Sequence, residues 1–510
     1  MVSNEVFVGA GTMATLVPEM DMFFDSMNVT WASGNANLNI AVLDSSEQAK
    51  YKFLKDLYVG CRAKVINETT DTVFYVTVTS NTTSSFTFDS DVSIMTSAGA
   101  ENVDVKLLAF GAPVIAPSTT NEKLLSDNWL GLVNSFTPPS VDVQTTQLPL
   151  MGGNTRNLAL QYKGAETVSG GSLDLSMNNG SWLYYALGKV SSLSNSNGSS
   201  DDWDSSTTNK FIYNSGGVGI SRVIATGIEY PPLPTTNDTV EGTLSNLTAY
   251  DEVASSDVLT YTFDESNGAS LPSFGLDVSY RKAGVSASTA VDNLTPHENM
   301  YSRIFTGCQV NTLSLNFTEG EELKTNLSLV TRRAYDVVTD DDNDYIPHNG
   351  KLNPSDLQNF SATASDNYPF MFSDGSLKVF SETYARVKSG SITINNNITP
   401  QRFIGNTSRQ VMNEHIPAQR TYEIQMSVLI TDTKLWDELR GNTESSGDIE
   451  INFTKDTATG EFIKLKLTDF IITNVDIPFP EDKGAIEASF TASARTLSNA
   501  QYKGKWALMH

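Results

Sequence analysis

The sequence predicts a mainly β protein in which a β-sandwich or barrel unit with a short helix occurs twice, behind a small β-rich N-terminal domain. Three observations lead to this prediction. Apolar and polar residues alternate with period two along much of the chain, as at Phe74, Val76 and Val78, which is typical of half-buried antiparallel strands. Helical patterns are few. Segments far apart in the chain repeat the same apolar pattern at constant offsets.

Residues 1–118 are expected to form the N-terminal domain. The clearest helical signal is the capping box Ser45-Ser46-Glu47-Gln48, followed by apolar residues on one helical face, and it predicts a helix over about 46–57. Strands follow to about Leu108, and the alternation at Phe86 and Phe88 begins one of them. The proline-bearing stretch 112–118 has the composition of a linker.

The remainder of the chain is predicted to contain two copies of one unit. Four apolar residues of two strands match four others at an offset of 251: Val141, Val143, Leu173 and Leu175 match Ile392, Ile394, Ile424 and Met426. Leu183 and Leu187 match Leu435 and Leu439 at 252, in short helix-like segments. Further strands match at 173 (Leu276 to Ile449) and at 162 (Leu313 to Val475). Constant offsets across separate elements are the signature of an internal repeat.

These offsets set the expected boundaries. The first copy spans 125–334 and the second 381–500, joined by an acidic connector at 335–380. Because the offset falls from 252 to 173, about 79 residues are extra in the first copy, at about 188–275. This insertion contains a run rich in Ser, Asn, Gly and Asp and strand-like pieces such as 259–263, so we expect it to decorate the outside.

Composition narrows the class of function. The 34 basic and 59 acidic residues leave a net charge of −25, which argues against a protein that binds nucleic acid by neutralising phosphates. No apolar stretch approaches the roughly 20 residues that span a bilayer, and the basic segment of a secretory leader is missing. The two cysteines, Cys61 and Cys308, are too few for a disulfide framework and are expected to be buried.

The chemical motifs are incomplete, so we expect no catalytic residue, no cofactor and no metal. Gly9-Ala10-Gly11-Thr12-Met13-Ala14 has the spacing of a dinucleotide loop, but Pro18 interrupts the helix that such a loop requires. Asp340, Asp342 and Asp344 have the spacing of a calcium loop, but Tyr345 stands where the turn needs Gly. Glycosidases need only two carboxylates that meet in space, so sequence alone leaves that class open.

Two pairs of segments carry a resemblance to a known family. They are Ser135-Phe136-Thr137-Pro138-Pro139-Ser140-Val141-Asp142-Val143 with Gly171-Ser172-Leu173-Asp174-Leu175, and Ser389-Gly390-Ser391-Ile392-Thr393-Ile394-Asn395-Asn396 with Arg420-Thr421-Tyr422-Glu423-Ile424. With their strand and loop pattern, about residues 125–500 resemble the tail tube proteins of long-tailed bacteriophages. The resemblance implies a β-sandwich whose inner sheet joins those of its neighbours into a barrel, in rings that stack into a tube for genomic DNA.

The resemblance also sets expectations for the assembly. Six tube units per ring is the usual arrangement of the family, so a chain with two units would close as a trimer with pseudo-sixfold symmetry. It would act in the virion tail with other tail proteins, assemble in the host cytoplasm, and hold DNA in the lumen only transiently. Because an acidic lumen repels phosphates, we expect acidic residues to outnumber basic ones there.

A loop string shared by the two copies supplies the candidate site. It reads Gly153-Asn154-Thr155-Arg156 in the first copy and Gly405-Asn406-Thr407-Ser408-Arg409 in the second. In the family that the chain resembles, this loop reaches toward the adjacent ring, so Arg156 and Arg409 are expected to help rings stack through hydrogen bonds to carboxylates. For the whole protein, the alternative to a tail tube protein is a carbohydrate-binding or carbohydrate-cleaving β-sandwich adhesin.

Overall fold

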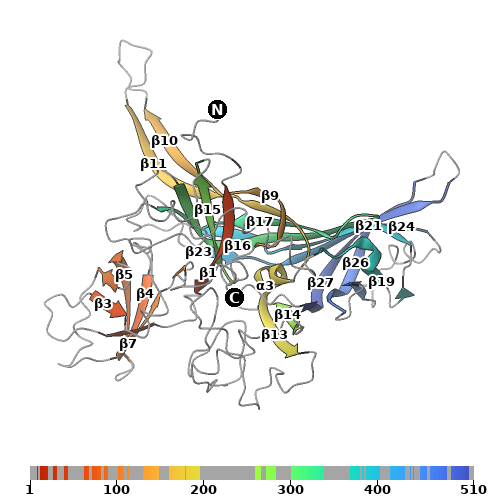
Figure 1. Ribbon diagram of the computed structural model, residues 1–510, viewed down its shortest axis with the longest axis horizontal. Helices are drawn as coiled ribbons and strands as arrows, with labels where there is room; N and C mark the ends of the chain where they lie inside the picture. Colours follow the sequence, from red (N-terminus) through yellow and green to blue (C-terminus); the bar gives the residue numbers. More distant parts are fainter. Residues whose placement is uncertain are drawn as a thin grey trace, which may run out of the picture.

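The fold is that of a computed structural model, which describes residues 9, 12–20, 27–30, 40–43, 62–67, 72–81, 85–89, 102–107, 112–113, 130–148, 160–178, 180–195, 259–265, 271–282, 300–337, 368–379, 382–383, 386–401, 414–430, 437, 440, 448–455, 460–478 and 484–504. The described part of the chain is mainly β, as predicted, and antiparallel strands form most of it (Figure 1).

A closed six-stranded barrel lies near the N-terminus. Its strands, in barrel order, are β2 (Met27–Thr30), β3 (Ile40–Leu43), β6 (Ser85–Phe88), β5 (Thr72–Asn81), β4 (Arg62–Asn67) and β7 (Asn102–Leu107). The predicted alternation holds, because Val76, Val78, Phe86 and Phe88 are all buried. Closure leaves no free strand edge. The helix expected over 46–57 lies outside the described residues.

The strand before this barrel belongs to the large sheet instead. β1 (Met13–Met20) pairs antiparallel with β15 (Phe274–Arg281), from Met13 opposite Ser279 to Pro18 opposite Phe274. It also pairs with the short strand β8 (Ala112–Pro113), which follows the barrel. The segment expected as one domain, 1–118, is therefore divided, with the barrel between two strands of the body. The G-x-G-x-x-A motif leads into a strand, which agrees with its rejection as a dinucleotide loop.

Two ladders of six strands make up the body. The first ladder runs β1-β15-β16-β17-β12-β9, where β16 is Met300–Thr318, β17 is Lys324–Val330, β12 is Ser172–Ser176 and β9 is Leu132–Thr137. The second ladder runs β19-β25-β26-β27-β24-β21, where the strands are Gly375–Val379, Ile449–Thr454, Phe462–Asp476, Glu487–Gly504, Thr421–Leu429 and Val387–Asn395. In each, a hairpin interrupts the chain between the last two strands: β10 (Ser140–Leu148) with β11 (Leu160–Ser169), and β22 (Ile398–Gln401) with β23 (Glu414–Pro417).

The ladders join through β16, whose second half pairs with β17 on one side and with β21 on the other. The result is one continuous sheet of eight strands, in the order β9-β12-β17-β16-β21-β24-β27-β26. The first half of β16 pairs with β15 and with β18 (Arg333–Val337), so this long strand contributes to two layers.

Apolar residues of one face of this sheet form the core. Leu173, Leu313, Ile394 and Ile424 are all within 1% of full burial, and they alternate with polar residues along their strands. The short helix α3 (Ser181–Leu187) packs into the same core with Leu183 and Leu187 inward, as its spacing predicted. The position expected for its counterpart, around Leu435 and Leu439, lies largely outside the described residues, although Asp437 and Arg440 are helical.

Two expected boundaries differ from the structure. The ends of the insertion do not merely decorate the surface. β13 (Gly188–Asn195) pairs with β14 (Leu259–Glu265), which pairs with β27, and Tyr261 and Phe263 are buried, with the Tyr261 ring stacked on that of Tyr502. The acidic connector, 335–380, contains a short helix η5 (Phe372–Asp374) and β19, which begins the second ladder. Its aspartate run at 340–344 lies outside the described residues.

Candidate assembly surfaces

The exposed face of the eight-stranded sheet is lined by hydroxyl and amide side chains. Antiparallel registers align them in rows that run across the strands. These rows are Ser135-Asp174-Asn326-Ser314-Thr393-Glu423-Ser493, Thr137-Ser172-Ser328-Thr312-Asn395-Thr421, Lys324-Asn316-Ser391-Gln425-Thr491-Asn474, and Thr318-Ser389-Ser427-Ser489-Asp476. Ile471 ends the first row at the edge strand β26.

Charges are sparse on this polar face. The charged members of its rows are Asp174, Glu423, Asp476 and Lys324, so carboxylates outnumber ammonium groups there by a small margin. Cross-strand hydrogen bonds join neighbouring side chains, as between the hydroxyls of Ser314 and Thr393 at 2.9 Å. The face is therefore wettable and weakly acidic, which differs in degree from the whole chain with its net charge of −25.

The junction between the two ladders is a regular antiparallel pair of strands. β16 and β21 pair from Thr312 opposite Asn395 to Thr318 opposite Ser389. Backbone bonds at its two ends, Asn396 N–H to Asn311 O at 2.8 Å and Glu319 N–H to Lys388 O at 2.8 Å, fix which pairs are hydrogen-bonded. In an antiparallel ladder such pairs alternate with non-hydrogen-bonded ones. Pairs such as Leu313 with Ile394 therefore exchange hydrogen bonds, and the pairs between them do not.

A polar cluster next to this junction caps helix α3. Asn396 donates from Nδ2 to the carbonyls of Ala186 at 3.0 Å and Val310 at 2.9 Å. Arg420 donates from Nε to Asn396 Oδ1 at 2.7 Å and from Nη2 to the carbonyl of Leu187 at 3.2 Å. A guanidinium at a helix C-terminus satisfies carbonyls that lack a partner within the helix and is favoured by the helix dipole. Side chains of the second ladder thus complete the helix of the first.

Both outer edges of the eight-stranded sheet are open among the described residues. At one end, β9 pairs with β12 along one side and has no registered partner along the other. At the opposite end, Phe470–Asp476 of β26 pair with β27 alone, because β25 reaches only the first half of that strand. Large apolar side chains at these edges are exposed: Val133 to 40%, Ile471 to 46% and Ile477 to 43%. Open, apolar edges bind another strand readily.

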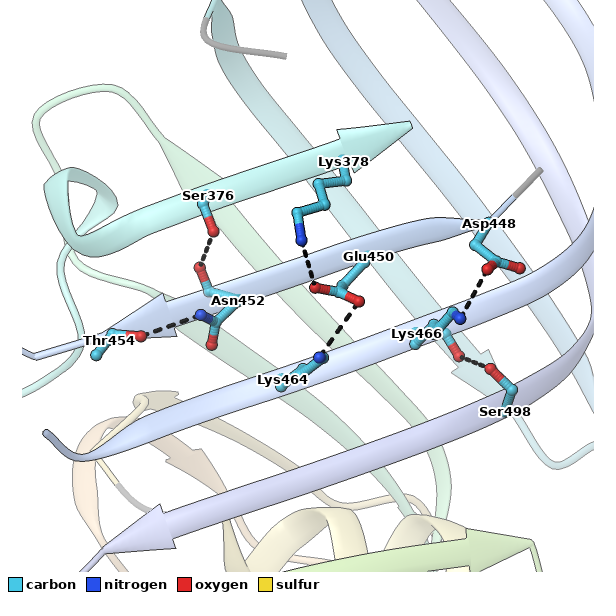
Figure 2. Close-up of polar contacts among 9 residues, drawn as sticks. All are labelled: Ser376, Lys378, Asp448, Glu450, Asn452, Thr454, Lys464, Lys466 and Ser498. Atoms are coloured by element: carbon cyan, nitrogen blue, oxygen red, sulfur yellow. Dashed lines mark hydrogen bonds and ion pairs between the residues drawn. The ribbon is translucent and has the colours of Figure 1, made fainter. Parts of the chain in front are cut away.

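A second exposed face carries a network of charges, on β19, β25 and β26 (Figure 2). Glu450 lies between two lysines, with Lys378 Nζ at 3.4 Å from Oε1 and Lys464 Nζ at 3.3 Å from Oε2. Partial burial acts to raise the pKa of Glu450, but the hydrogen bonds and charges of both lysines outweigh it and hold the pKa below its ordinary value. A hydrogen bond to Asp448, with a 2.7 Å Nζ–Oδ2 distance, raises the pKa of Lys466. Exposed pairs of this kind favour solubility more than stability.

The predicted site residues fall in three places. The loop strings Gly153 to Arg156 and Gly405 to Arg409 lie between β10 and β11 and between β22 and β23, outside the described residues. The strand residues Leu173, Leu175, Ile392, Ile394, Ile424 and Met426 are buried in the eight-stranded sheet.

The other two strand residues lie elsewhere. Val141 and Val143 lie on β10, which pairs with β11, whereas Ile392 lies on β21 in the eight-stranded sheet. The expected match of Val141 with Ile392 is therefore corrected. β9 takes the place opposite β12 that was expected for these valines, because the chain leaves the sheet at Pro138 and Pro139. A signal for β9 was present, since two prolines directly after a short run suit an edge strand.

The described residues contain no group of three or more His, Cys, Asp or Glu side chains placed to hold a metal ion. Among the same residues, no helix is long and apolar enough to cross a membrane. Cys308 is buried, as expected, and Cys61 lies outside the described residues.

Comparison with known proteins identifies the family. The model of a family described as phage tail tube protein matches residues 105–494. The chain belongs to the phage tail tube family. It is therefore a structural protein of the tail tube, located in the virion tail, and the adhesin alternative is set aside. No curated protein matches the chain.

Chains of three solved structures are similar to parts of this tail tube protein. A chain of the virion of a native gene transfer agent particle is 15% identical, with a TM-score of 0.20, and the match covers 25% of this chain and 95% of that one. A chain from the tail of an empty particle of that kind is 14% identical, with a TM-score of 0.18, 23% of this chain and 84% of that one being covered. Hcp1 from Flavobacterium johnsoniae is 18% identical, with a TM-score of 0.17, and the match covers 24% and 93%.

Proposed function

We propose that the two ladders are copies of one tube unit, and that three chains close into a ring of six units. The ladders have the same strand order, and their irregularities recur at matching positions. Bulges fall at Asn134 in β9 and Lys388 in β21, 254 residues apart, and at Asn311 in β16 and Thr473 in β26, 162 apart. Such bulges are specific features of a fold rather than accidents of sequence.

A backbone conformation that few residues adopt supports the same equivalence. Gly307 in β16 and Asp469 in β26 have φ values of 65° and 54°, and they too are 162 residues apart. Positive φ is uncommon for residues other than Gly, so its recurrence at one offset favours a shared ancestry of the two strands. The offset equals the one that the apolar pattern of Leu313 and Val475 predicted.

Ring closure would repeat between chains the junction that β16 and β21 make within one chain. By the offsets above, the free half of β26 would receive β9 and the start of β10 of the next chain, with Val475 opposite Ser140. Prolines in these edges suit that register. Pro139 and Pro478 fall at positions equivalent to Thr393 and Asn316, which are non-hydrogen-bonded across the β16–β21 junction, so their missing N–H groups cost no hydrogen bond across the proposed contact.

The polar face would then line the bore. Its hydroxyl and amide rows can exchange hydrogen bonds with water, and its few carboxylates disfavour lasting contact with phosphates, so double-stranded DNA would slide rather than bind. With this face inward, three carboxylates and one ammonium group among its rows would give the bore a small acidic excess, and uncharged groups would dominate it. The protein would act without catalysis, assemble in the host cytoplasm, bind other tail proteins at the tube ends, and stack its rings through the loops of Arg156 and Arg409.

The observation that carries this proposal is the pair of open edges on a sheet that already contains one such junction. Ser140→Pro tests it, because Ile394, the residue equivalent to Ser140, directs its N–H across the junction. We expect the proline variant to remain folded and to form no rings in negative-stain images, whereas Ser140→Ala, which keeps the N–H, forms rings with the native mass of three chains. Rings of six chains, or normal rings from Ser140→Pro, would contradict the proposal.

A further inference from the structure

The hairpin of the second ladder, β22–β23, is seated on the first ladder. His415 of β23 is 3% exposed, and its Nδ1 lies 3.0 Å from Oε1 of Gln309 on β16. Gln309 is 1% exposed and donates from Nε2 to the carbonyl of Leu271 at 2.6 Å. Arg332 is close enough that its charge, added to burial, helps to lower the pKa of His415. We call this contact, in which one ladder's hairpin packs on the other ladder, the plug. We call the surface of Gln309 and Arg332 that receives the hairpin the platform.

The hairpin of the first ladder has the same register. Thr146 lies opposite Tyr162 in β10–β11, and Pro400 lies opposite His415 in β22–β23, which are offsets of 254 and 253. Both hairpins have the same spacing to the sheet strands on either side. Tyr162 therefore occupies the position that His415 occupies in the second hairpin.

The platform also occurs twice. Gln309 pairs with Val330 in the first ladder, and Ile471 pairs with Ser493 in the second, at offsets of 162 and 163. An arginine follows two residues after the second member of each pair: Arg332 in the first ladder and Arg495 in the second. The second platform thus presents Ile471 and Arg495 where the first presents Gln309 and Arg332.

The two counterparts differ from the internal plug in exposure. Tyr162 is 48% exposed and Ile471 is 46% exposed, and the side chain of Arg495 is 63% exposed. The counterparts of Tyr162 and Ile471 are buried in the internal contact, so a contact of the same kind between chains would cover both side chains. Figure 1 shows β10–β11 and β26–β27 on opposite sides of the body, so one chain does not bring them together.

We propose that β10–β11 of one chain is seated on β26–β27 of the adjacent chain, with the Tyr162 ring on Ile471 and beside the Arg495 guanidinium. The inference rests on the proposed ring, in which β9 of one chain lies next to β26 of another. The occupant of the platform is a second copy of this chain.

The chemistry of the two plugs fits their different tasks. Within one chain, the hairpin and the sheet are already covalently connected, so a buried His–Gln pair needs only to satisfy its own hydrogen bonds. Between chains, burial must drive association, which an aromatic ring on an aliphatic side chain supplies. A guanidinium beside a tyrosine ring adds cation–π attraction.

Cysteine cross-linking tests the contact in the full-length chain. In a Cys61→Ser background that keeps the buried Cys308, Tyr162→Cys and Ile471→Cys are combined and the assembled protein is oxidised. Each chain then offers one cysteine to each neighbour, so we expect covalent dimers and closed trimers on a non-reducing denaturing gel. The matched control pairs Ile471→Cys with Lys163→Cys, because adjacent strand residues point to opposite faces, and it should stay largely uncross-linked.

Assembly measurements give a second readout. Tyr162→Ala should raise the protein concentration needed for assembly by about tenfold, the loss of one well-buried anchor, while Tyr162→Phe should leave it unchanged. Rings that form normally but give no Tyr162–Ile471 cross-link would overturn the hairpin seat and leave the ring itself standing. Cross-links confined to single chains would overturn it too. Absence of rings from the unsubstituted protein would overturn the proposed function, and the seat with it.

Discussion

A buried ion pair of the second ladder lies next to a segment that contacts the first ladder. Lys455 Nζ lies 3.1 Å from Glu461 Oε2, with the side chains 0% and 1% exposed. The ammonium also lies 4.8 Å and 4.7 Å from the ring centres of Tyr368 and Phe370. The backbone of Phe370 is hydrogen-bonded to that of Met177 and Leu323 in the first-ladder region, so the segment whose rings contact the ammonium also contacts the first ladder. Glu461→Gln leaves the Lys455 ammonium buried without its carboxylate and should therefore destabilise the fold.

The size of the effect follows from burial. At 3.1 Å and an effective dielectric constant of about 20, the charges attract by about 5 kcal/mol, and removal of one partner from such a buried pair costs about 3–5 kcal/mol. The two aromatic rings remain, and their cation–π attraction of about 2 kcal/mol keeps the cost near the low end. We expect Glu461→Gln to lose about 3 kcal/mol. Lys455→Met combined with Glu461→Gln removes the unpaired charge and should recover all but about 1 kcal/mol.

Urea unfolding of the unassembled chain, followed by tryptophan fluorescence, measures these differences. Glu450→Gln is the matched control, because its partner Lys378 is 49% exposed and the pair is worth less than about 1 kcal/mol. The reasoning is refuted if Glu461→Gln unfolds at the same urea concentration as Glu450→Gln. It is equally refuted if the double variant is no more stable than Glu461→Gln alone.

Three further predictions concern the junction, the pH response and the loops. Gly390→Ala should destabilise the β16–β21 junction by about 1–3 kcal/mol in the same unfolding assay, since an added Cβ would meet Phe317 Cζ at 2.5 Å and Gln425 O at 3.0 Å. Burial and then Arg332 lower the pKa of His415 to about 3, so between pH 6.5 and about 3 the unfolded chain binds the extra proton; stability should fall by about 1.4 kcal/mol per pH unit on acidification, and His415→Gln should flatten this slope. Replacing Arg156 and Arg409 together with Glu should leave rings intact and shorten the tubes seen in negative stain, more so at low salt, and tubes of normal length would contradict the stacking role.

Local patterns in the sequence predicted the strands well, because half-buried strands alternate by necessity. Phe86 and Phe88, Leu313 and Leu315, and Ile463 and Leu465 all lie inward as expected, and α3 forms where Leu183 and Leu187 indicated a helical face. Alternation does not encode which strands pair. It therefore gave no sign that Met13–Met20 belongs with β15, some 260 residues later in the chain.

Register was the second quantity that the pattern could not supply. A period of two leaves shifts by two residues equally favourable for the core. The apolar pattern therefore aligns Leu173 with Ile424, whereas the bulge positions of the two proposed copies align it with Met426. The pattern does not indicate which strands form the open edges for a related reason, since an edge strand such as β9 differs from a central one in its partners and not in its composition. Only the prolines after β9 distinguish it.

One sheet with one internal junction and two open edges has a direct consequence for assembly. Because the internal junction pairs β16 with β21, the eight-stranded sheet keeps, among the described residues, one open edge at β9 and one at β26. A head-to-tail contact between these edges makes a closed ring when its rotation divides a full turn, and otherwise makes an open filament. If the internal junction and the outer one have the same geometry, each chain turns the sheet by twice the angle of one unit. The curvature that folding builds into a single chain would then set the number of chains in the ring before any two chains meet.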